Sequence, residues 1–254
     1  APQPHMIKFL DKFITRTNNL DYIAKGFKNL SKQYPVEKIF NSINKFSLNS
    51  EIRYVGGCVR KIILQENVDD IDLATNLNPQ QVCEALKNSN IHFYETGIDH
   101  GTITALIDNY RFEITSLRED IQTDGRHSKV KFSTDWKKDA LRRDFTINSI
   151  YSDAVGNLFD PFNGREDLKN GLIKFIGDPQ ERIKEDYLRI LRYLRFFLSY
   201  SSQNHDPKTL KIIKKNLDGV SIISKERLLD EFKKLIKSCH LTKISKDKFS
   251  LELF

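Results

Sequence analysis

The chain has 254 residues, of which 39% are hydrophobic and 30% charged, and its net charge is +7. This composition is typical of a globular protein with a real core and excludes a disordered or fibrous chain. No apolar run approaches the ~20 residues of a membrane span, so we expect no membrane partner. The three cysteines form no CxxC pair, so neither a zinc knuckle nor a disulfide framework is indicated, and we expect a reduced, intracellular protein. The positive charge favours a polyanionic partner.

The first part of the chain predicts short helices. Apolar residues recur at helical spacing over residues 7–14 and 39–46, and a break is expected near Pro35. Residues 1–5 (APQPH) resemble the remnant of an expression tag and are excluded from the fold prediction. We therefore expect an N-terminal helical segment over residues 1–50.

A strand-rich region follows, and then a helical one. Short runs rich in β-branched and aromatic residues predict strands in IRYVGG, DIDLAT, IHFYET, GTITALI and YRFEITSL, and residues 79–87 predict a helix between them. We expect a head domain over 51–165. After Pro161 the pattern becomes helical, and a helical neck is expected over 166–254, with helices at 182–200, 208–216 and 225–238. The predicted fold class is α+β.

Two aspartates separated by one residue form the first candidate site. Asp70 and Asp72 are at positions i and i+2 of an expected strand, so their side chains project from one face. Adjacent carboxylates repel unless a cation lies between them, and Mg²⁺ prefers such oxygens and shares its coordination with phosphates. Glu113, in another strand-like run, is a third catalytic candidate, and Gly56-Gly57 allows backbone N–H groups to approach a phosphate. Exposed strand-end carboxylates without a metal are the alternative.

The segment RRDFTIN is the second candidate site. Arg142 and Arg143 suit the oxygens of a nucleoside triphosphate, because guanidinium groups bind phosphate in a bidentate way. Asp144 and Asn148 suit ribose hydroxyl groups. A charged helix start capped by Asp144 is the alternative.

The segment EDYLR is a candidate for base selection. Asp186 and Arg189 are i,i+3 neighbours on an expected helix. Adenine and cytosine each present an amine donor beside a ring-nitrogen acceptor, whereas uracil and guanine present a carbonyl beside an N–H. An accepting Asp and a donating Arg therefore fit A and C and mismatch U and G. A surface salt bridge worth at most about 1 kcal/mol is the alternative.

These motifs occur in the order seen in a known family. GGCVR with DIDLAT, the loop at 117–140, RRDFTIN, DPFNGREDL, EDYLRILRYLRF and ISKERLLDEFKKLI together resemble class II tRNA nucleotidyltransferases, the CCA-adding enzymes, and the related bacterial poly(A) polymerases. The resemblance covers about residues 54–235. It implies a polymerase-β-like nucleotidyltransferase head followed by an all-α neck, with Mg²⁺ as cofactor and with CTP, ATP and the 3′ end of tRNA as partners.

The resemblance also implies roles for individual residues. Asp70 and Asp72 would hold Mg²⁺. The segment 117–140 matches a flexible loop that helps the site change from CTP to ATP, with Asp124, Gly125 and Arg126 at its centre. The implied nucleotide contacts come from Gly56, Gly57, Arg60, Arg142, Arg143, Asp144, Asn148, Glu185, Asp186, Arg189 and Arg192.

The expected activity is template-independent addition of CMP and AMP to the 3′ end of tRNA. CC-only addition, A-only addition and poly(A) synthesis are alternatives within the family, and a non-catalytic RNA-binding module is the alternative from another class. The cytoplasm is the expected compartment, and an organelle is compatible with the composition. The sequence predicts neither the oligomeric state nor whether the natural chain continues past Phe254.

Overall fold

The computed structural model describes residues 22–123, 128–238 and 246–253. The chain forms two compact units. The first comprises Ala1–Glu119, Phe132–Asp139 and Ile150–Phe159, and the second comprises Asp120–Lys131, Ala140–Ser149 and Asp160–Phe254, within the described residues. The division into two units does not test the domain limits expected from the sequence, at residues 50 and 165, and these limits stay a prediction.

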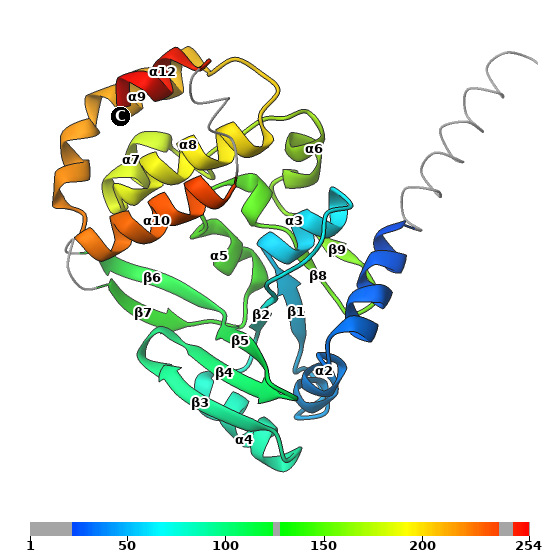
Figure 1. Cartoon of the computed structure of the whole chain (residues 1–254). Coiled ribbons are helices and arrows are strands. Elements are labelled where there is room, and N and C mark those ends of the chain that lie inside the picture. The colour runs from blue at the N-terminus through cyan, green and yellow to red at the C-terminus, as the bar shows by residue number, and fades with distance from the viewer. Residues whose placement is uncertain (1–21, 124–127, 239–245, 254) are drawn as a thin grey trace, which may run out of the picture. The chain divides into compact units, whose positions relative to one another are not determined.

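The first unit is built on a seven-stranded sheet, coloured from blue to green in Figure 1. Its strand order is β3-β4-β5-β2-β1-β8-β9; β2 and β5 are parallel, and the other neighbouring pairs are antiparallel. The five strands expected from the runs rich in β-branched and aromatic residues are present, and the α+β class is confirmed. The strands are β1 (Ile52–Val55), β2 (Asp72–Thr75), β3 (His92–Gly97), β4 (Thr102–Ile107), β5 (Tyr110–Ser116), β8 (Tyr151–Ser152) and β9 (Leu158–Phe159).

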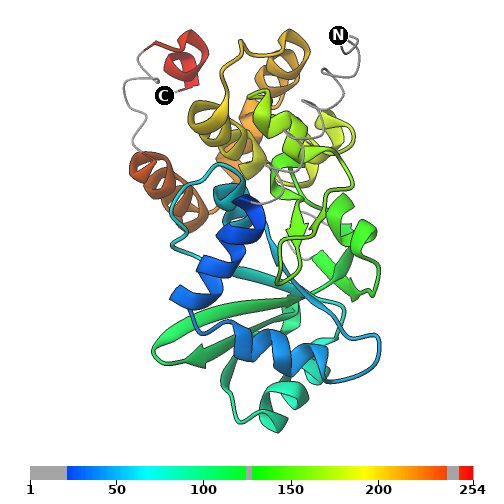
Figure 2. The same cartoon turned by 90° about the vertical axis from the view of Figure 1, so that its right-hand side faces the viewer.

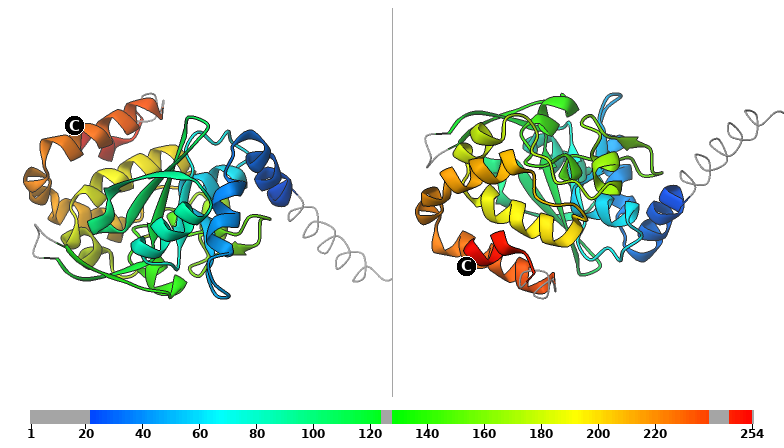
Figure 3. Two further views of the ribbon diagram at one scale, coloured as in Figure 1. Left: turned by 90° about the horizontal axis from the view of Figure 1, so that it is seen from below. Right: turned by 90° about the horizontal axis from the view of Figure 1, so that it is seen from above.

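Helices cover one face of this sheet. Residues 22–33 are helical, followed by α2 (Glu37–Asn44), α3 (Gly57–Ile63) and α4 (Pro79–Asn88). Helix α4 begins where expected, because Asn78 and Gln81 form a capping box around Pro79. Helices α2 and α4 lie side by side, as the views from the side and from below show (Figures 2 and 3).

The N-terminal helices share the core of the sheet. The rings of Phe27 and Phe40 pack on Tyr54 of β1, with centroid separations of 5.0 and 4.7 Å. All three side chains are almost completely buried. Burying aromatic rings of this size contributes a large part of the hydrophobic stabilisation of the unit.

The segment expected to be a flexible loop contains a second, two-stranded sheet. It consists of β6 (Arg118–Thr123) and β7 (Ser128–Phe132), and α5 (Trp136–Leu141) follows it. Asp124, Gly125 and Arg126 lie outside the described residues, so the role expected for them stays a prediction.

Helices dominate the second unit. Beside the short 3₁₀ segments η2 (Thr146–Asn148) and η3 (Leu217–Ile222), it contains α6 (Gly164–Lys169), α7 (Pro179–Glu185), α8 (Leu188–Tyr200), α9 (Pro207–Lys215), α10 (Lys225–Lys237) and α12 (Lys248–Leu253). Helices α8 and α10 pack together through Leu194, Leu198 and Leu235 (Figure 1). In the described part of the chain no helix has the length and apolarity that crossing a bilayer requires.

One expected helix is wrong. The pattern over 182–200 predicted a single helix, but α7 ends at Glu185 and α8 begins at Leu188. Asp186 has extended backbone angles (φ −157°, ψ 105°), and its Oδ1 accepts a hydrogen bond from the backbone N–H of Leu188 at 3.1 Å. Short polar side chains compete with helical hydrogen bonds in this way, and here the competition starts a new helix. Asp186 and Arg189 are therefore not i,i+3 neighbours on one helix.

Candidate functional site

Two of the predicted catalytic carboxylates lie on neighbouring strands. Asp72 is the first residue of β2 and pairs in parallel register with Glu113 of β5. The next pair, Leu73 and Ile114, is buried at 1% and 0% exposure. Because successive side chains alternate between the faces of a sheet, the two carboxylates belong to the face opposite the core. Asp70 is exposed and lies two residues before β2, not inside the strand as expected.

A cavity of about 490 Å³ opens beside these carboxylates. It is lined by Asp70, Tyr94, Thr96, Thr104, Arg111 and Glu113, all from the first unit. The tyrosine, the two threonines and the arginine were not predicted from the motifs. The period-2 pattern of YRFEITSL was the available signal for Arg111, since it puts Arg111 and Glu113 on one face.

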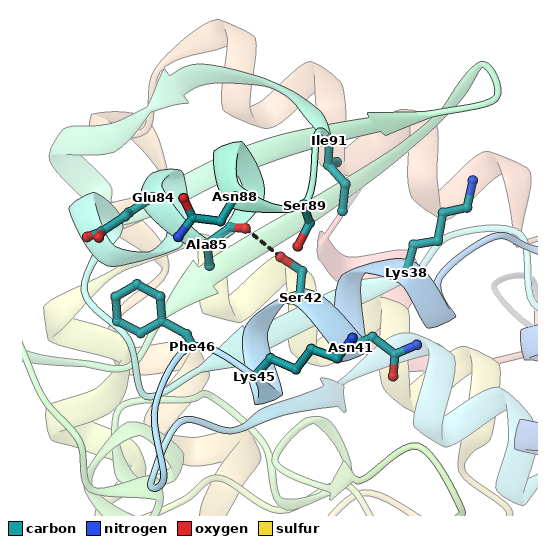
Figure 4. Close-up of a pocket in the computed structure, with 10 residues that line it drawn as sticks. All are labelled: Lys38, Asn41, Ser42, Lys45, Phe46, Glu84, Ala85, Asn88, Ser89 and Ile91. Carbon is teal, nitrogen blue, oxygen red and sulfur yellow. Dashed lines mark hydrogen bonds between the residues drawn. The ribbon is translucent and has the colours of Figure 1, made fainter.

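A second, larger cavity of about 630 Å³ lies between α2 and α4 (Figure 4). Lys38, Lys45 and Glu84 are among the residues that line it, and Ser42 Oγ donates a hydrogen bond to the carbonyl oxygen of Ala85 at 2.8 Å. None of the residues predicted from the motifs is among those that line it. We assign the chemistry to the smaller cavity, because Asp70 and Glu113, two of the three predicted catalytic carboxylates, line it.

The chemistry of the smaller cavity fits a divalent cation. Among the described residues no three His, Cys, Asp or Glu side chains are gathered closely enough to form a complete metal cage. Mg²⁺ seldom uses such a cage: it binds through one or two carboxylates and takes its other oxygens from water and substrate phosphates. Asp70 and Asp72, with Glu113 in register, supply hard oxygen donors of this kind.

The Gly-Gly turn supports the start of α3. Gly56 has φ 71° and ψ −122°, a conformation open essentially to glycine alone, and α3 begins at the next residue. Arg60, on the same helix, is buried, with 7% of its surface exposed. Cys58 Sγ contacts the carbonyl oxygens of Val55 and Asp72 at 3.5 and 3.8 Å, and burial raises the pKa of this thiol to about 12. Cys58 is therefore a neutral packing residue.

In the second unit, Asp144 is the centre of a buried polar network. Its carboxylate accepts hydrogen bonds from Arg192 Nε at 2.6 Å, Asn148 Nδ2 at 3.1 Å and the backbone N–H of Phe145 at 2.8 Å. Burial alone would raise the pKa of Asp144, but the charge of Arg192 and the three hydrogen bonds outweigh it, so that the pKa is lowered. Three predicted nucleotide-binding residues are thus brought into direct contact with one another.

The two arginines before Asp144 are connected to α7 through their backbone carbonyl groups. The carbonyl oxygens of Arg142 and Arg143 both accept hydrogen bonds from Arg182 Nη2, the second at 2.6 Å. Arg189 Nη1 donates to the carbonyl oxygen of Arg182 at 2.8 Å and to Glu185 Oε2 at 2.7 Å. Glu185 Oε2 also accepts from Arg182 Nη1 at 2.6 Å. Arg189 is therefore held by Glu185 and by backbone carbonyl groups.

Asp186 has a different partner. Its two carboxylate oxygens accept hydrogen bonds from Arg227 of α10, at 3.1 and 2.7 Å. The expected pair of Asp186 with Arg189 is thus replaced by two separate ion pairs, Asp186 with Arg227 and Glu185 with Arg189. Arg227 was not predicted from the sequence, since no local pattern links residues 41 positions apart.

Comparison with known proteins gives consistent matches. Residues 52–174 match the family described as the poly(A) polymerase head domain, and residues 205–247 match the one described as the probable RNA- and SrmB-binding site of polymerase A. The chain is 47% identical over 196 residues to the protein of Homo sapiens named CCA tRNA nucleotidyltransferase 1, mitochondrial, a match that covers 76% of this chain and 45% of that protein.

Bacterial proteins match as well. The CCA-adding enzyme of Lactobacillus helveticus is 41% identical over 187 residues, covering 73% of this chain and 46% of that protein. The crystal structure of the Bacillus stearothermophilus CCA-adding enzyme in complex with CTP superposes with a TM-score of 0.72 at 28% identity, covering 86% of this chain and 51% of that one. The chain thus spans about half the length of the relatives it matches.

Proposed function

Since the chain belongs to the nucleotidyltransferase family that contains poly(A) polymerase head domains and CCA-adding enzymes, we propose that it adds CMP and AMP to the 3′ end of tRNA, with CTP and ATP as substrates. The observation that carries the proposal is the register pair of Asp72 and Glu113, together with the cavity that Glu113 and Asp70 both line. A binding module has no need of three carboxylates facing a polyanionic RNA, because like charges repel.

The reaction is a nucleotidyl transfer. The 3′-oxygen of the RNA forms a bond to the α-phosphorus, the bond from that phosphorus to the bridging oxygen breaks, and pyrophosphate leaves with the electron pair. Asp70 and Asp72 would hold the divalent cation, for which we propose Mg²⁺; when bound, it neutralises charge on the phosphates. The exposed carboxylate of Glu113 is available to accept the proton of the attacking hydroxyl group.

Residues of the second unit would select the base. We assign to Asp186 the role of accepting a hydrogen bond from the exocyclic amine of cytosine or adenine, and to Arg189 that of donating to the adjacent ring nitrogen. The contacts of Arg189 with Glu185 and the carbonyl oxygen of Arg182 support this role, because they hold the guanidinium group in one orientation. Asp144, Asn148 and Arg192 form an ordered polar network suited to a ribose.

One experiment tests the activity. The protein is incubated with Mg²⁺ and tRNA transcripts that end before the tail, after CC, or after CCA, and each nucleotide is supplied alone and then CTP with ATP. We expect CC and then one A to be added, followed by a stop. A long ladder of A would support poly(A) synthesis, the second candidate, which the description of the matched head domain favours. Salt-dependent RNA binding without incorporation would contradict an enzyme and support a binding module.

Neighbouring aspartates provide a matched control for the catalytic assignment. Asp70→Asn and Asp72→Asn should each abolish incorporation while the thermal unfolding transition stays unchanged. Asp69→Asn should retain activity, because Asp69 is exposed and forms an ion pair with Lys61. Full activity in both Asp70→Asn and Asp72→Asn would contradict the metal assignment.

The cellular compartment is a separate proposal. We keep the cytoplasm as the proposed compartment, with an organelle as the alternative that the name of the human relative supports. Fractionation of cells that express the full-length tagged protein distinguishes the two.

A further inference from the structure

The acidic cavity continues along the sheet beyond the carboxylates. Three register pairs follow one another across β2, β5, β4 and β3: Asp72 with Glu113, Glu113 with Thr104, and Thr104 with Tyr94. Residues paired directly across strands share a face of the sheet. Because neighbouring strands are 4.7–4.9 Å apart, the backbone of Tyr94 lies about 10 Å from that of Glu113. The row thus extends from the carboxylates to the aromatic residue Tyr94, over a distance that one or two nucleotides can span.

The residues of this row leave a surface suited to a flat ligand. Tyr94 is a large aromatic residue, yet 53% of it is exposed. Thr104 lies between Tyr94 and Glu113 in this row, and its small side chain is in hydrogen-bond contact with Thr96, two residues after Tyr94 on β3 (Oγ1 to Oγ1, 3.1 Å). Because Thr104 is small, no large side chain separates Tyr94 from Glu113 along this row.

Arg111 adds a positive charge to the same cavity. It is exposed on β5 and lies two residues before Glu113, so the two side chains share a face. The nucleotidyl transfer itself assigns no role to Arg111 or Tyr94. An aromatic ring and a guanidinium group along one groove are the elements with which proteins bind single-stranded nucleic acid, by stacking on bases and contacting phosphates.

We propose that this cavity is the subsite for the 3′-terminal nucleotides of the RNA primer. The terminal hydroxyl group lies at Asp70 and Glu113, the ring of Tyr94 stacks on a base of the primer end, and Arg111 contacts a backbone phosphate. The terminal base changes with each addition. Stacking tolerates such a change, because every base presents a π face, whereas hydrogen-bond recognition of one base would not.

The test compares Tyr94→Ala with Tyr94→Phe and His92→Ala. His92 precedes Tyr94 by two residues on the same exposed face of β3 and is not among the residues lining the cavity, so it serves as the matched control. KM is measured for a primer ending in CC and for ATP. Loss of stacking in Tyr94→Ala should raise the primer KM about tenfold and leave the ATP KM unchanged. Tyr94→Phe and His92→Ala should behave as the wild type.

Arg111→Ala tests the charge separately. It should raise the primer KM and lower the slope of log KM against log salt by about 0.7, the contribution of one phosphate contact to a single strand. An unchanged primer KM in Tyr94→Ala, or a rise in the ATP KM instead, would overturn the subsite.

The proposal rests on the proposed function, but the two fail differently. Binding of a fluorescein-labelled single-stranded RNA, measured by anisotropy without nucleotide or metal, reports the subsite even in a chain that incorporates nothing. Weaker binding by Tyr94→Ala than by His92→Ala supports the subsite, whether or not the protein incorporates nucleotides. Equal binding by the two variants, or no binding by the wild type, overturns it.

Discussion

The guanidinium group of Arg227 chelates the carboxylate of Asp186 through two hydrogen bonds, at 3.1 and 2.7 Å. The backbone N–H of Leu188 takes a third acceptor position on the same carboxylate. A carboxylate offers about four lone-pair positions, so one stays available for an amine donor. Arg227 therefore orients Asp186 at the start of α8 and leaves it able to accept a hydrogen bond from a base.

The first prediction concerns this orientation. Arg227→Ala should relax the discrimination of CTP and ATP against UTP and GTP, because the Asp186 carboxylate loses its bidentate partner. Arg227→Lys should be intermediate, since an ammonium group cannot form the same fork. The pair is partly exposed, so the free energy of unfolding should fall by less than about 1 kcal/mol. Incorporation of each nucleotide supplied alone measures the effect.

Lys225→Ala, which removes the same charge from α10, is the control for that experiment. Discrimination that is unchanged in Arg227→Ala, or equally relaxed in Lys225→Ala, would rule out an orienting role.

The second prediction concerns acid stability. The pKa of Asp144 is lowered in the folded protein, so its contribution to stability is complete above its unfolded pKa of about 3.9 and is lost as the pH falls through the folded value. Asp144→Asn should cost about 3 kcal/mol at pH 7, because it leaves the Arg192 charge without its carboxylate. The variant should also lose less stability than the wild type below pH 4. Urea unfolding at pH 7 and pH 3 measures both effects, and an equal loss in both proteins would refute the assignment.

The third prediction concerns the Gly-Gly turn. Gly56→Ala should reduce the free energy of unfolding by about 1–3 kcal/mol, because the φ of 71° is strained for a residue with a Cβ atom. Gly57→Ala is the control: an added Cβ would meet only Arg60 Nη2, at 3.7 Å, an ordinary contact. Denaturant midpoints of the two variants give the comparison. Equal midpoints would show that the turn does not need glycine at position 56.

The fourth prediction concerns the link between α8 and α10. Glu231 is 3% exposed and forms an ion pair with Arg195, whereas the neighbouring Asp230 pairs with Lys234 on the surface. Glu231→Gln should cost about 3 kcal/mol, since it leaves Arg195 partly buried without its carboxylate. Asp230→Asn should cost less than about 0.5 kcal/mol. Thermal unfolding of both variants checks the difference, and similar melting temperatures would contradict it.

Much of the local structure was predictable from the sequence. Runs rich in β-branched and aromatic residues identified β1 to β5, and the helical stretch over residues 79–87 identified α4. These signals are local, since the side-chain period of a strand and the cap of a helix involve residues within one or two turns of each other. The break at Asp186 was missed, because apolar residues lie on both sides of it, with Ile183 buried in α7 and Leu188 buried in α8. The extended backbone of Asp186 and its side-chain hydrogen bond to Leu188 mark the break in the structure.

The sequence alone therefore determined the elements, the candidate carboxylates and the family resemblance. Only the tertiary structure decided which of these residues meet. The strand order inserts β2 between β5 and β1, and this non-sequential pairing brings Glu113 beside Asp72 and aligns Tyr94 with both. Likewise, packing of α10 on α8 accompanies the pairing of Arg227 with Asp186. Strand order and helix packing depend on burial summed over the whole core, which no local pattern contains.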